Sequence, residues 1–169
     1  NDLLVIVYHF IDILSHAKTD NHIVDQLIRD DKTFRSLTYN WFENSSVLKI
    51  IKAAAESGFK LVITTDHGTV YVKKPSKVVG DRETSTNIRY KTGKSLTYDS
   101  SDVWAITNPE KLFLPKGNLS SKYIFAKNNI FLAYPKNYNH FVNYYKETYQ
   151  HGGISLEECI IPISILEPK

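Results

Sequence analysis

Carboxylate and imidazole side chains stand at three separated places in this chain, and together they suit a metal. The five candidate ligands are Asp12, His16, Asp66, His67 and His151. Carboxylate oxygens and imidazole nitrogens are the groups with which proteins hold zinc and related divalent cations. Five such donors at three places predict a site for two cations.

Asp66 and His67 directly follow an apolar run, residues 59–64, which predicts a buried parallel strand. Gly68 comes next and allows the backbone to turn. Open α/β sheets place their ligands at the carboxyl ends of parallel strands. We therefore expect the Asp-His pair at that edge. The alternative is an aspartate that only holds the turn.

The other two places are weaker when each is taken alone. Asp12 and His16 are four residues apart, so they face the same way on a helical turn. That spacing also occurs by chance, and a solvated helix start is the alternative for this pair. His151 precedes two glycines and could be an ordinary loop residue. The three places together are less easily accidental.

The elements that must position these residues alternate between strands and helices. Strands are predicted over residues 3–8, 59–64 and 160–166. Helices are predicted over residues 21–31, 33–42, 45–57 and 139–149. The first strand is apolar on both faces, which is typical of an interior parallel strand. The predicted fold class is α/β, with a right-handed βαβ unit in a mainly parallel sheet with flanking helices.

Residues 69–135 differ in pattern and predict an antiparallel β insertion within a single domain, residues 1–169. Its short strands are expected at residues 70–72, 103–106, 123–126 and 130–134. Asn128 and Asn129 tolerate the positive φ of a tight hairpin turn between the last two strands. Residues 73–94 form a basic loop that is tethered near the predicted metal edge.

Composition sets wider limits on the class of protein. The chain has 169 residues, of which 42% are hydrophobic and 23% are charged, as in ordinary globular domains. No apolar run reaches the roughly 18 residues of a membrane span, so we expect no membrane insertion. The single Cys159 cannot form an internal disulfide, and with no signal-peptide pattern it favours the cytoplasm. A net charge of +3 permits an anionic partner without demanding one.

The order of the motifs resembles the metal-binding pattern of the alkaline phosphatase superfamily. Asp-x-x-x-His at residues 12–16 is followed by Thr-x-Asp-His-Gly at residues 64–68 and by a late histidine. Residues 151–158, His-Gly-Gly-Ile-Ser-Leu-Glu-Glu, are similar to the closing motif of its PglZ branch. Residues 79–91 resemble the PglZ effector domain of PorX-type response regulators of the type IX secretion system. The likeness covers essentially the whole chain, as the C-terminal part of such a domain.

The resemblance implies a zinc-dependent phosphatase or phosphodiesterase with two metal sites. Asp12, His16 and His151 would hold one cation, and Asp66 and His67 would belong to the second. Zinc suits these ligands, with manganese as the alternative. Three basic side chains that follow the Asp-His-Gly motif are predicted to bind substrate phosphate. The forked guanidinium of arginine suits that contact. The three residues are Arg82, Arg89 and Lys91. The alternative for these three is a solvated loop.

The serine or threonine nucleophile of the superfamily and a further aspartate have no counterpart in this sequence. Both are expected before residue 1, so we expect the isolated chain to hydrolyse phosphate esters poorly. The other hypothesis is a non-catalytic, metal-stabilised output module that regulates secretion. The expected partners are a phosphate-ester or nucleotide-like substrate, a second copy in a homodimer, and signalling or secretion proteins.

Overall fold

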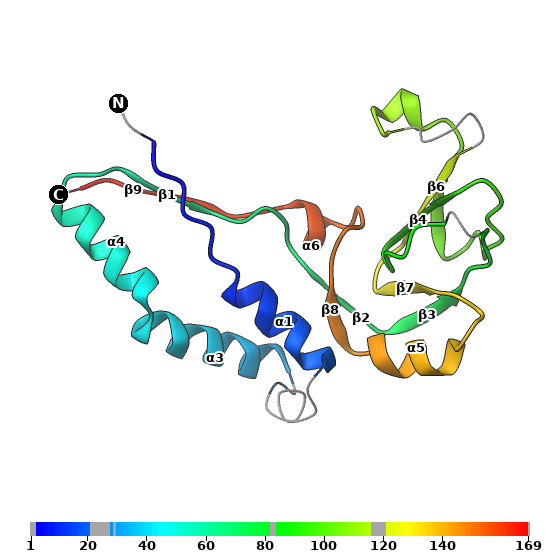
Figure 1. The fold of residues 1–169 in the computed structure, drawn as a ribbon, viewed down its shortest axis with the longest axis horizontal. Helices are drawn as coiled ribbons and strands as arrows, with labels where there is room; N and C mark the ends of the chain where they lie inside the picture. The colour runs from blue at the N-terminus through cyan, green and yellow to red at the C-terminus, as the bar shows by residue number, and fades with distance from the viewer. Residues whose placement is uncertain (1–2, 21–27, 29, 82–83, 116–120, 169) are drawn as a thin grey trace. The chain divides into compact units, whose positions relative to one another are not determined.

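The computed structural model describes residues 3–20, 28, 30–81, 84–115 and 121–168. The contacts divide the chain into two compact units. The first comprises residues 1–65 and 162–169, and the second comprises residues 66–161. Figure 1 labels most of the elements of both units.

The first unit contains three described helices and one pair of strands. Its helices are α1 (Phe10–Asp20), α3 (Asp31–Asn44) and α4 (Ser46–Glu56). Its strands are β1 (Leu61–Thr64) and β9 (Ile163–Leu166). The predicted helices over residues 33–42 and 45–57 are confirmed. The predicted helix over residues 21–31 lies mostly outside the described residues.

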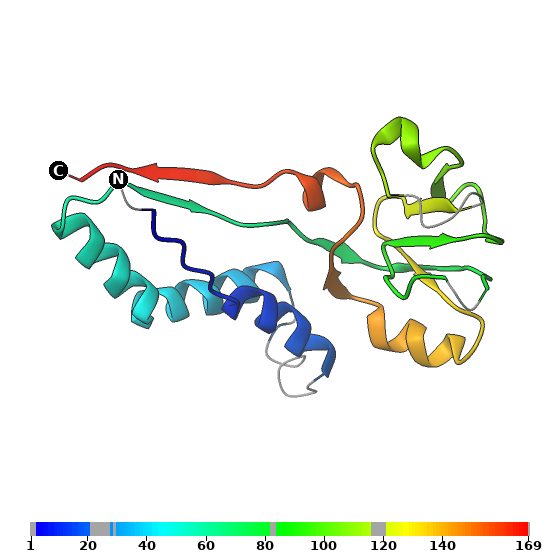
Figure 2. The ribbon, with the colours of Figure 1, turned by 45° about the horizontal axis from the view of Figure 1, so that its top comes forward.

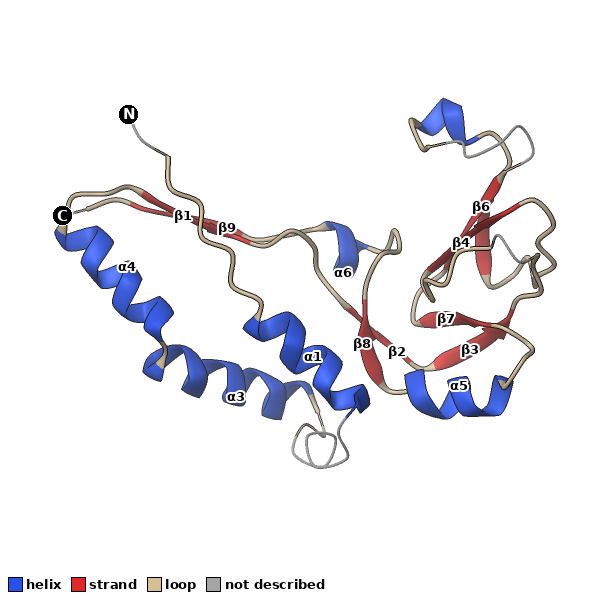
Figure 3. Cartoon of the chain, viewed as in Figure 1, coloured by secondary structure: helices blue, strands red, loops and turns tan. Residues whose placement is uncertain are grey.

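Local caps explain where α3 and α4 begin. The Asp30 carboxylate accepts a hydrogen bond from the Thr33 backbone N–H at 2.8 Å, and this bond lowers the pKa of Asp30. Helices α3 and α4 follow one another with a short break (Figure 3), and Ser45 lies between them as the C-cap of α3 and the N-cap of α4. Its hydroxyl donates to the Phe42 carbonyl at 2.8 Å and accepts from the Leu48 N–H at 3.4 Å. The hydroxyl therefore links the end of α3 to the start of α4.

Strands β1 and β9 form an antiparallel pair, seen side by side in Figures 1 and 2. Leu61 lies opposite Leu166, and Thr64 lies opposite Ile163. The strand predicted over residues 59–64 was expected to be parallel and buried, and both expectations are wrong. It pairs antiparallel, and Val62 within it is 60% exposed. An apolar run indicates a strand but carries no information about the direction of its partner.

Residues 3–8 do not form the predicted interior strand. They run irregularly and their side chains are exposed, with Leu3 at 89%. The predicted βαβ unit is accordingly wrong. Helix α1 begins at Phe10, whose ring stacks on Trp41 of α3 with centroids 4.0 Å apart. This aromatic contact joins α1 to α3 within the unit.

The described part of the second unit consists of short strands, two short α-helices and one 3₁₀ turn. Its strands are β2 (Val70–Val72), β3 (Lys74–Lys77), β4 (Tyr90–Gly93), β5 (Val103–Ile106), β6 (Lys122–Ala126), β7 (Ile130–Ala133) and β8 (Thr148–Gln150). Its helices are α5 (Tyr138–Tyr145), α6 (Leu156–Cys159) and the 3₁₀ turn η1 (Pro109–Leu112). Strands β4, β6 and β5 form one antiparallel sheet, and β2 pairs with β8 antiparallel. Among the described strand pairs only β3–β7 is parallel, and the others are antiparallel. A mainly parallel sheet is therefore not confirmed.

The turn of the predicted hairpin between β6 and β7 is present, but the two strands do not pair with each other. Asn128 has φ 45°, as predicted. Strand β6 nevertheless pairs with β4 and β5, whereas β7 pairs with β3. Side chains of β7 are buried on both faces, because Ile130 and Leu132 belong to one core cluster and Phe131 and Ala133 to the other. Strand β7 therefore lies between two hydrophobic clusters rather than at the edge of a hairpin.

Among the described helices, none is both long enough and apolar enough to cross a membrane.

Candidate metal centre

The strand pair β2–β8 brings two remote histidines to one place in the second unit. Val70 at the start of β2 lies opposite Gln150 at the end of β8. His67 shortly precedes β2, and His151 directly follows β8. Because the pair is antiparallel, both histidines emerge at the same end of the ribbon.

The rings of His67 and His151 stack face to face. Their centroids are 3.9 Å apart and their planes differ by 16°. One ring nitrogen of each lies within 4.8 Å of the other. Both side chains are partly buried, so they are held in place yet remain within reach of an ion.

A hydrogen bond to the backbone sets the tautomer of neutral His67. Its Nδ1 lies 3.0 Å from the Gly68 carbonyl oxygen. A carbonyl can only accept, so Nδ1 carries the proton and the lone pair lies on Nε2. Metal-binding histidines characteristically donate their other ring N–H to such an oxygen. The arrangement of His67 therefore fits a metal ligand.

Asp66 adds a carboxylate beside this imidazole. Its Oδ1 lies 3.8 Å from His67 Nε2, and its side chain is 87% exposed. The second unit thus holds a carboxylate next to His67 and a second imidazole stacked on His67. Carboxylate oxygens and imidazole nitrogens are donors of the kinds that bind zinc.

The two remaining predicted ligands belong to the first unit. Asp12 and His16 both lie on α1, so their four-residue spacing falls on one helix as predicted. The Asp12 side chain is partly buried. The His16 side chain lies outside the described part of the chain.

Arg89 does not lie where a substrate-binding cation is needed. Its side chain is fully buried and forms a two-pronged ion pair with Glu158. Arg89 Nε donates to Glu158 Oε1 at 2.9 Å, and Nη2 donates to Oε2 at 2.9 Å. This placement contradicts the predicted contact of Arg89 with substrate phosphate, because the guanidinium is already bound to a carboxylate inside the unit.

Lys91 is likewise buried, with 1% of its surface exposed. Its Nζ donates to the Thr86 carbonyl at 3.2 Å and lies 4.1 Å from the centre of the Tyr134 ring. Burial lowers the pKa of Lys91 to about 8. This position also contradicts a predicted contact with substrate. Arg82 lies outside the described residues.

Glu158 is a residue that the sequence did not single out for the site. Burial alone would raise the pKa of its carboxyl group, but the hydrogen bonds and charge of Arg89 outweigh burial and lower it. Residues 155–158, Ser-Leu-Glu-Glu, have the spacing of a capping box. The half in which Glu158 Oε2 accepts from the Ser155 N–H is present, at 3.1 Å. The distant pairing with Arg89 left no local signal.

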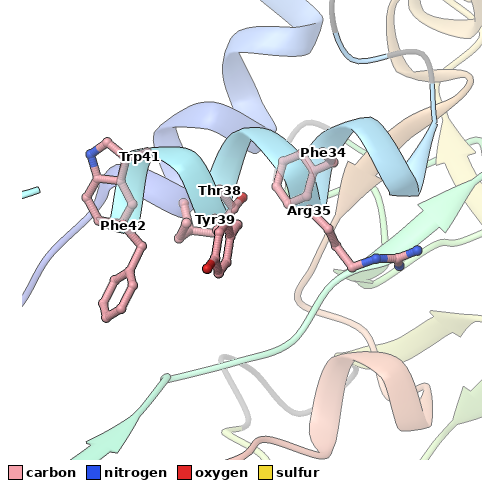
Figure 4. Close-up of a pocket in the computed structure, with 7 residues that line it drawn as sticks. Phe34, Arg35, Thr38, Tyr39, Trp41 and Phe42 are labelled. Atoms are coloured by element: carbon pink, nitrogen blue, oxygen red, sulfur yellow. The ribbon is translucent and has the colours of Figure 1, made fainter. Parts of the chain in front are cut away.

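The first unit contains a separate apolar pocket of about 420 Å³ between α1 and α3. Figure 4 shows Phe34, Trp41 and Phe42 among the side chains that line it. The lining includes Arg35 but no carboxylate or imidazole. The pocket therefore lacks the groups that would bind a metal.

A comparison with known families decides what kind of domain this is. Residues 1–165 match the family described as the BREX system PglZ alkaline phosphatase-like domain. The chain belongs to the PglZ family. The predicted PglZ domain and its alkaline phosphatase superfamily are thereby confirmed. No curated protein matches the chain.

Membership in the PglZ family gives the histidine pair a chemical context. Alkaline phosphatase-like domains belong to a phosphoesterase-type superfamily that typically depends on metal ions. The stacked imidazoles of this PglZ chain carry nitrogen donors of the kind that bind zinc and related divalent cations.

Proposed function

We propose that this PglZ chain supplies the metal ligands of a zinc-dependent phosphoester hydrolase. The observation that carries the proposal is the stacked pair of His67 and His151 beside Asp66. The two histidines come from separate motifs, whose order resembles the metal-binding pattern of the alkaline phosphatase superfamily, and the family match over residues 1–165 supports that resemblance.

In this proposal, Asp12, His16 and His151 hold one cation, and Asp66 and His67 hold the second. Zinc is the preferred ion and manganese the alternative. Cations held by these residues would supply the positive charge that stabilises a phosphoryl group during hydrolysis. The chain's own part is to fix the imidazoles, with the Gly68 carbonyl orienting His67 so that Nε2 is the ligand atom.

The proposal assigns the nucleophile, a serine or threonine, to sequence that precedes Asn1, together with a further carboxylate ligand. The chain then forms the C-terminal part of the domain, as in the effector domain of PorX-type response regulators. The substrate is a phosphomonoester or phosphodiester, or a nucleotide-like compound. This assignment rests on the resemblance of residues 79–91 and 151–158.

A specific observation favours the second hypothesis, a metal-stabilised output module without catalysis. Arg89 and Lys91, two of the three cations predicted to bind phosphate, are buried within the second unit. Without them, the predicted substrate contacts reduce to Arg82. The metal site is common to both hypotheses, whereas turnover belongs to the first alone.

Hydrolysis of bis-p-nitrophenyl phosphate and p-nitrophenyl phosphate by the full-length protein separates the two hypotheses. Zinc-dependent turnover that is lost in His151→Ala would support the hydrolase. Tight zinc binding without turnover of either ester would support the output module. Failure of the wild-type protein to bind zinc or manganese would contradict both.

A further inference from the structure

We propose that the buried Arg89–Glu158 pair positions the two histidine-bearing loops of the second unit. The inference rests on the proposed metal site, because it concerns how His67 and His151 are held for a cation. In this role Arg89 and Glu158 are positioning residues that act through hydrogen bonds to the loops.

The Glu158 carboxylate holds the loop that follows His151. Its Oε1 accepts a hydrogen bond from the Gly153 N–H at 2.9 Å, and its Oε2 accepts one from the Ser155 N–H at 3.1 Å. A Cβ on Gly153 would come within 2.5 Å of Oε2. The second glycine of the His-Gly-Gly motif is therefore needed so that the backbone can approach the carboxylate.

The main chain of the same region holds the loop that contains His67. The Gly68 N–H donates to the Glu158 carbonyl at 2.9 Å. A Cβ on Gly68 would lie 2.0 Å from the Glu157 carbonyl oxygen, so only glycine fits this contact. Glu158 thus binds both histidine loops, one through its carboxylate and the other through its backbone.

Arg89 anchors Glu158 to the core of the unit. Besides its two bonds to the carboxylate, the guanidinium donates to the carbonyls of Ala126, at 3.4 Å, and of Ile130. These carbonyls belong to β6 and β7, which carry the buried core. The Asn87 side chain fixes the backbone of Arg89 by accepting its N–H at 2.7 Å. The histidine loops are therefore connected through Glu158 and Arg89 to the most buried strands.

The chemistry of the pair explains why it resists small movements. Each carboxylate oxygen receives one N–H from Arg89 and one from the loop backbone. Bidentate pairs fix the relative orientation of both groups, and a buried charge cannot easily leave its partner. An amide in place of the carboxylate would replace one acceptor oxygen with an NH2 group, a donor that would face two other donors. Glu158→Gln preserves side-chain size and removes this geometry.

The test uses the chelator-treated 169-residue chain and four variants. Glu158→Gln and Arg89→Met break the pair, while Glu157→Gln removes a charge at an exposed neighbouring position and serves as the control. Nuclear Overhauser effects between the ring protons of His67 and His151 report the stack without metal. Calorimetric titration with zinc chloride reports the ligand site.

We expect both pair-breaking variants to lose the inter-ring signals and to bind zinc about 10- to 100-fold more weakly, as for other residues that orient metal ligands. Glu157→Gln should match the wild type in both measurements. Arg89→Lys, which retains the charge but not the forked guanidinium, should lose the inter-ring signals and zinc affinity to the same extent as Arg89→Met.

Unchanged inter-ring signals and zinc affinity in Glu158→Gln would overturn the inference, and so would an equal loss in Glu157→Gln. Loss of the signals of the β3–β7 core in the pair-breaking variants would also overturn it, since the pair would then hold the fold and not the ligands. If the wild-type chain binds no zinc, the proposed function fails, and the inter-ring signals alone decide the inference.

Discussion

Asp66 and His67 are neighbours in sequence but differ in how the fold holds them. The imidazole is partly buried, stacked on His151 and bonded to the Gly68 carbonyl, whereas the carboxylate is 87% exposed. Asp66 therefore contributes little to packing. The proposed role of Asp66 is to bind a cation.

Asp66→Ala should lower the zinc content of the chain from two ions to one, because it removes a proposed ligand of the second site. The fold should be unaffected, since the side chain is exposed. Zinc content is measured by elemental analysis after dialysis, and folding by circular dichroism. A variant that retains both ions at the affinity of the wild type would refute the assignment of Asp66.

The buried amine of Lys91 should give the stability of the protein a distinct pH dependence. The pKa of Lys91 falls from its ordinary value of 10.5 to about 8 because burial disfavours the charge. Between these values the unfolded chain binds a proton that the folded chain does not, so stability rises with pH. Below about pH 8 both states are charged, and the penalty of burial is fully present.

Urea denaturation of the wild type and of Lys91→Met checks this prediction. From about pH 7.5 to about pH 10, the free energy of unfolding of the wild type should increase relative to the variant by at least about 1 kcal/mol. A difference that does not change over this range would show that the amine is charged in the folded state as in water.

At the residue scale, the sequence displays the donor types of the proposed metal site, but it does not reveal that two of the basic side chains predicted to bind substrate are buried. Histidines and aspartates at motif spacing are visible in the sequence, whereas burial is not. Arg89 and Lys91 stand in a polar, basic stretch that looks like a solvated loop. The partner that buries Arg89 is Glu158, which is remote in sequence. Such a pairing depends on tertiary structure and leaves no local pattern.

Among the elements, helices α3 and α4 were predictable and the strand pairings were not. The signals for a helix are local, such as the cap at Ser45 and the apolar spacing that follows it. The partner of a strand is chosen by the rest of the fold. Residues 59–64 and 3–8 therefore suggested parallel neighbours, while β1 pairs antiparallel with β9.

Ser45→Ala should destabilise the first unit by about 1 kcal/mol, because it removes the hydroxyl that caps α4 and bonds to the end of α3. Ser46→Ala is the control, since Ser46 is exposed and is the first residue of the helix. Urea denaturation followed by Trp41 fluorescence, in a Trp104→Phe background, reports this unit. Equal stability of the two variants would show that the cap contributes nothing.

For the whole molecule, the match to the PglZ family extends over residues 1–165 and so includes both compact units. The order of motifs that predicted this family depends only on residue types and their succession, which a sequence displays directly. The division into two units depends on which segments touch. The role of the second unit in bringing His67 and His151 together follows from the pairing of β2 with β8.

Zinc binding by single histidine variants tests the central claim, that His67 and His151 are metal ligands, most directly. Calorimetric titration of the chelator-treated chain should show saturable zinc binding in the wild type, and His67→Ala and His151→Ala should each weaken it sharply. His140→Ala is the matched control, because His140 is exposed on α5 and its described ring contacts are with Phe141 and Tyr144. Absence of zinc binding by the wild type, or equal binding by all three variants, would contradict the account.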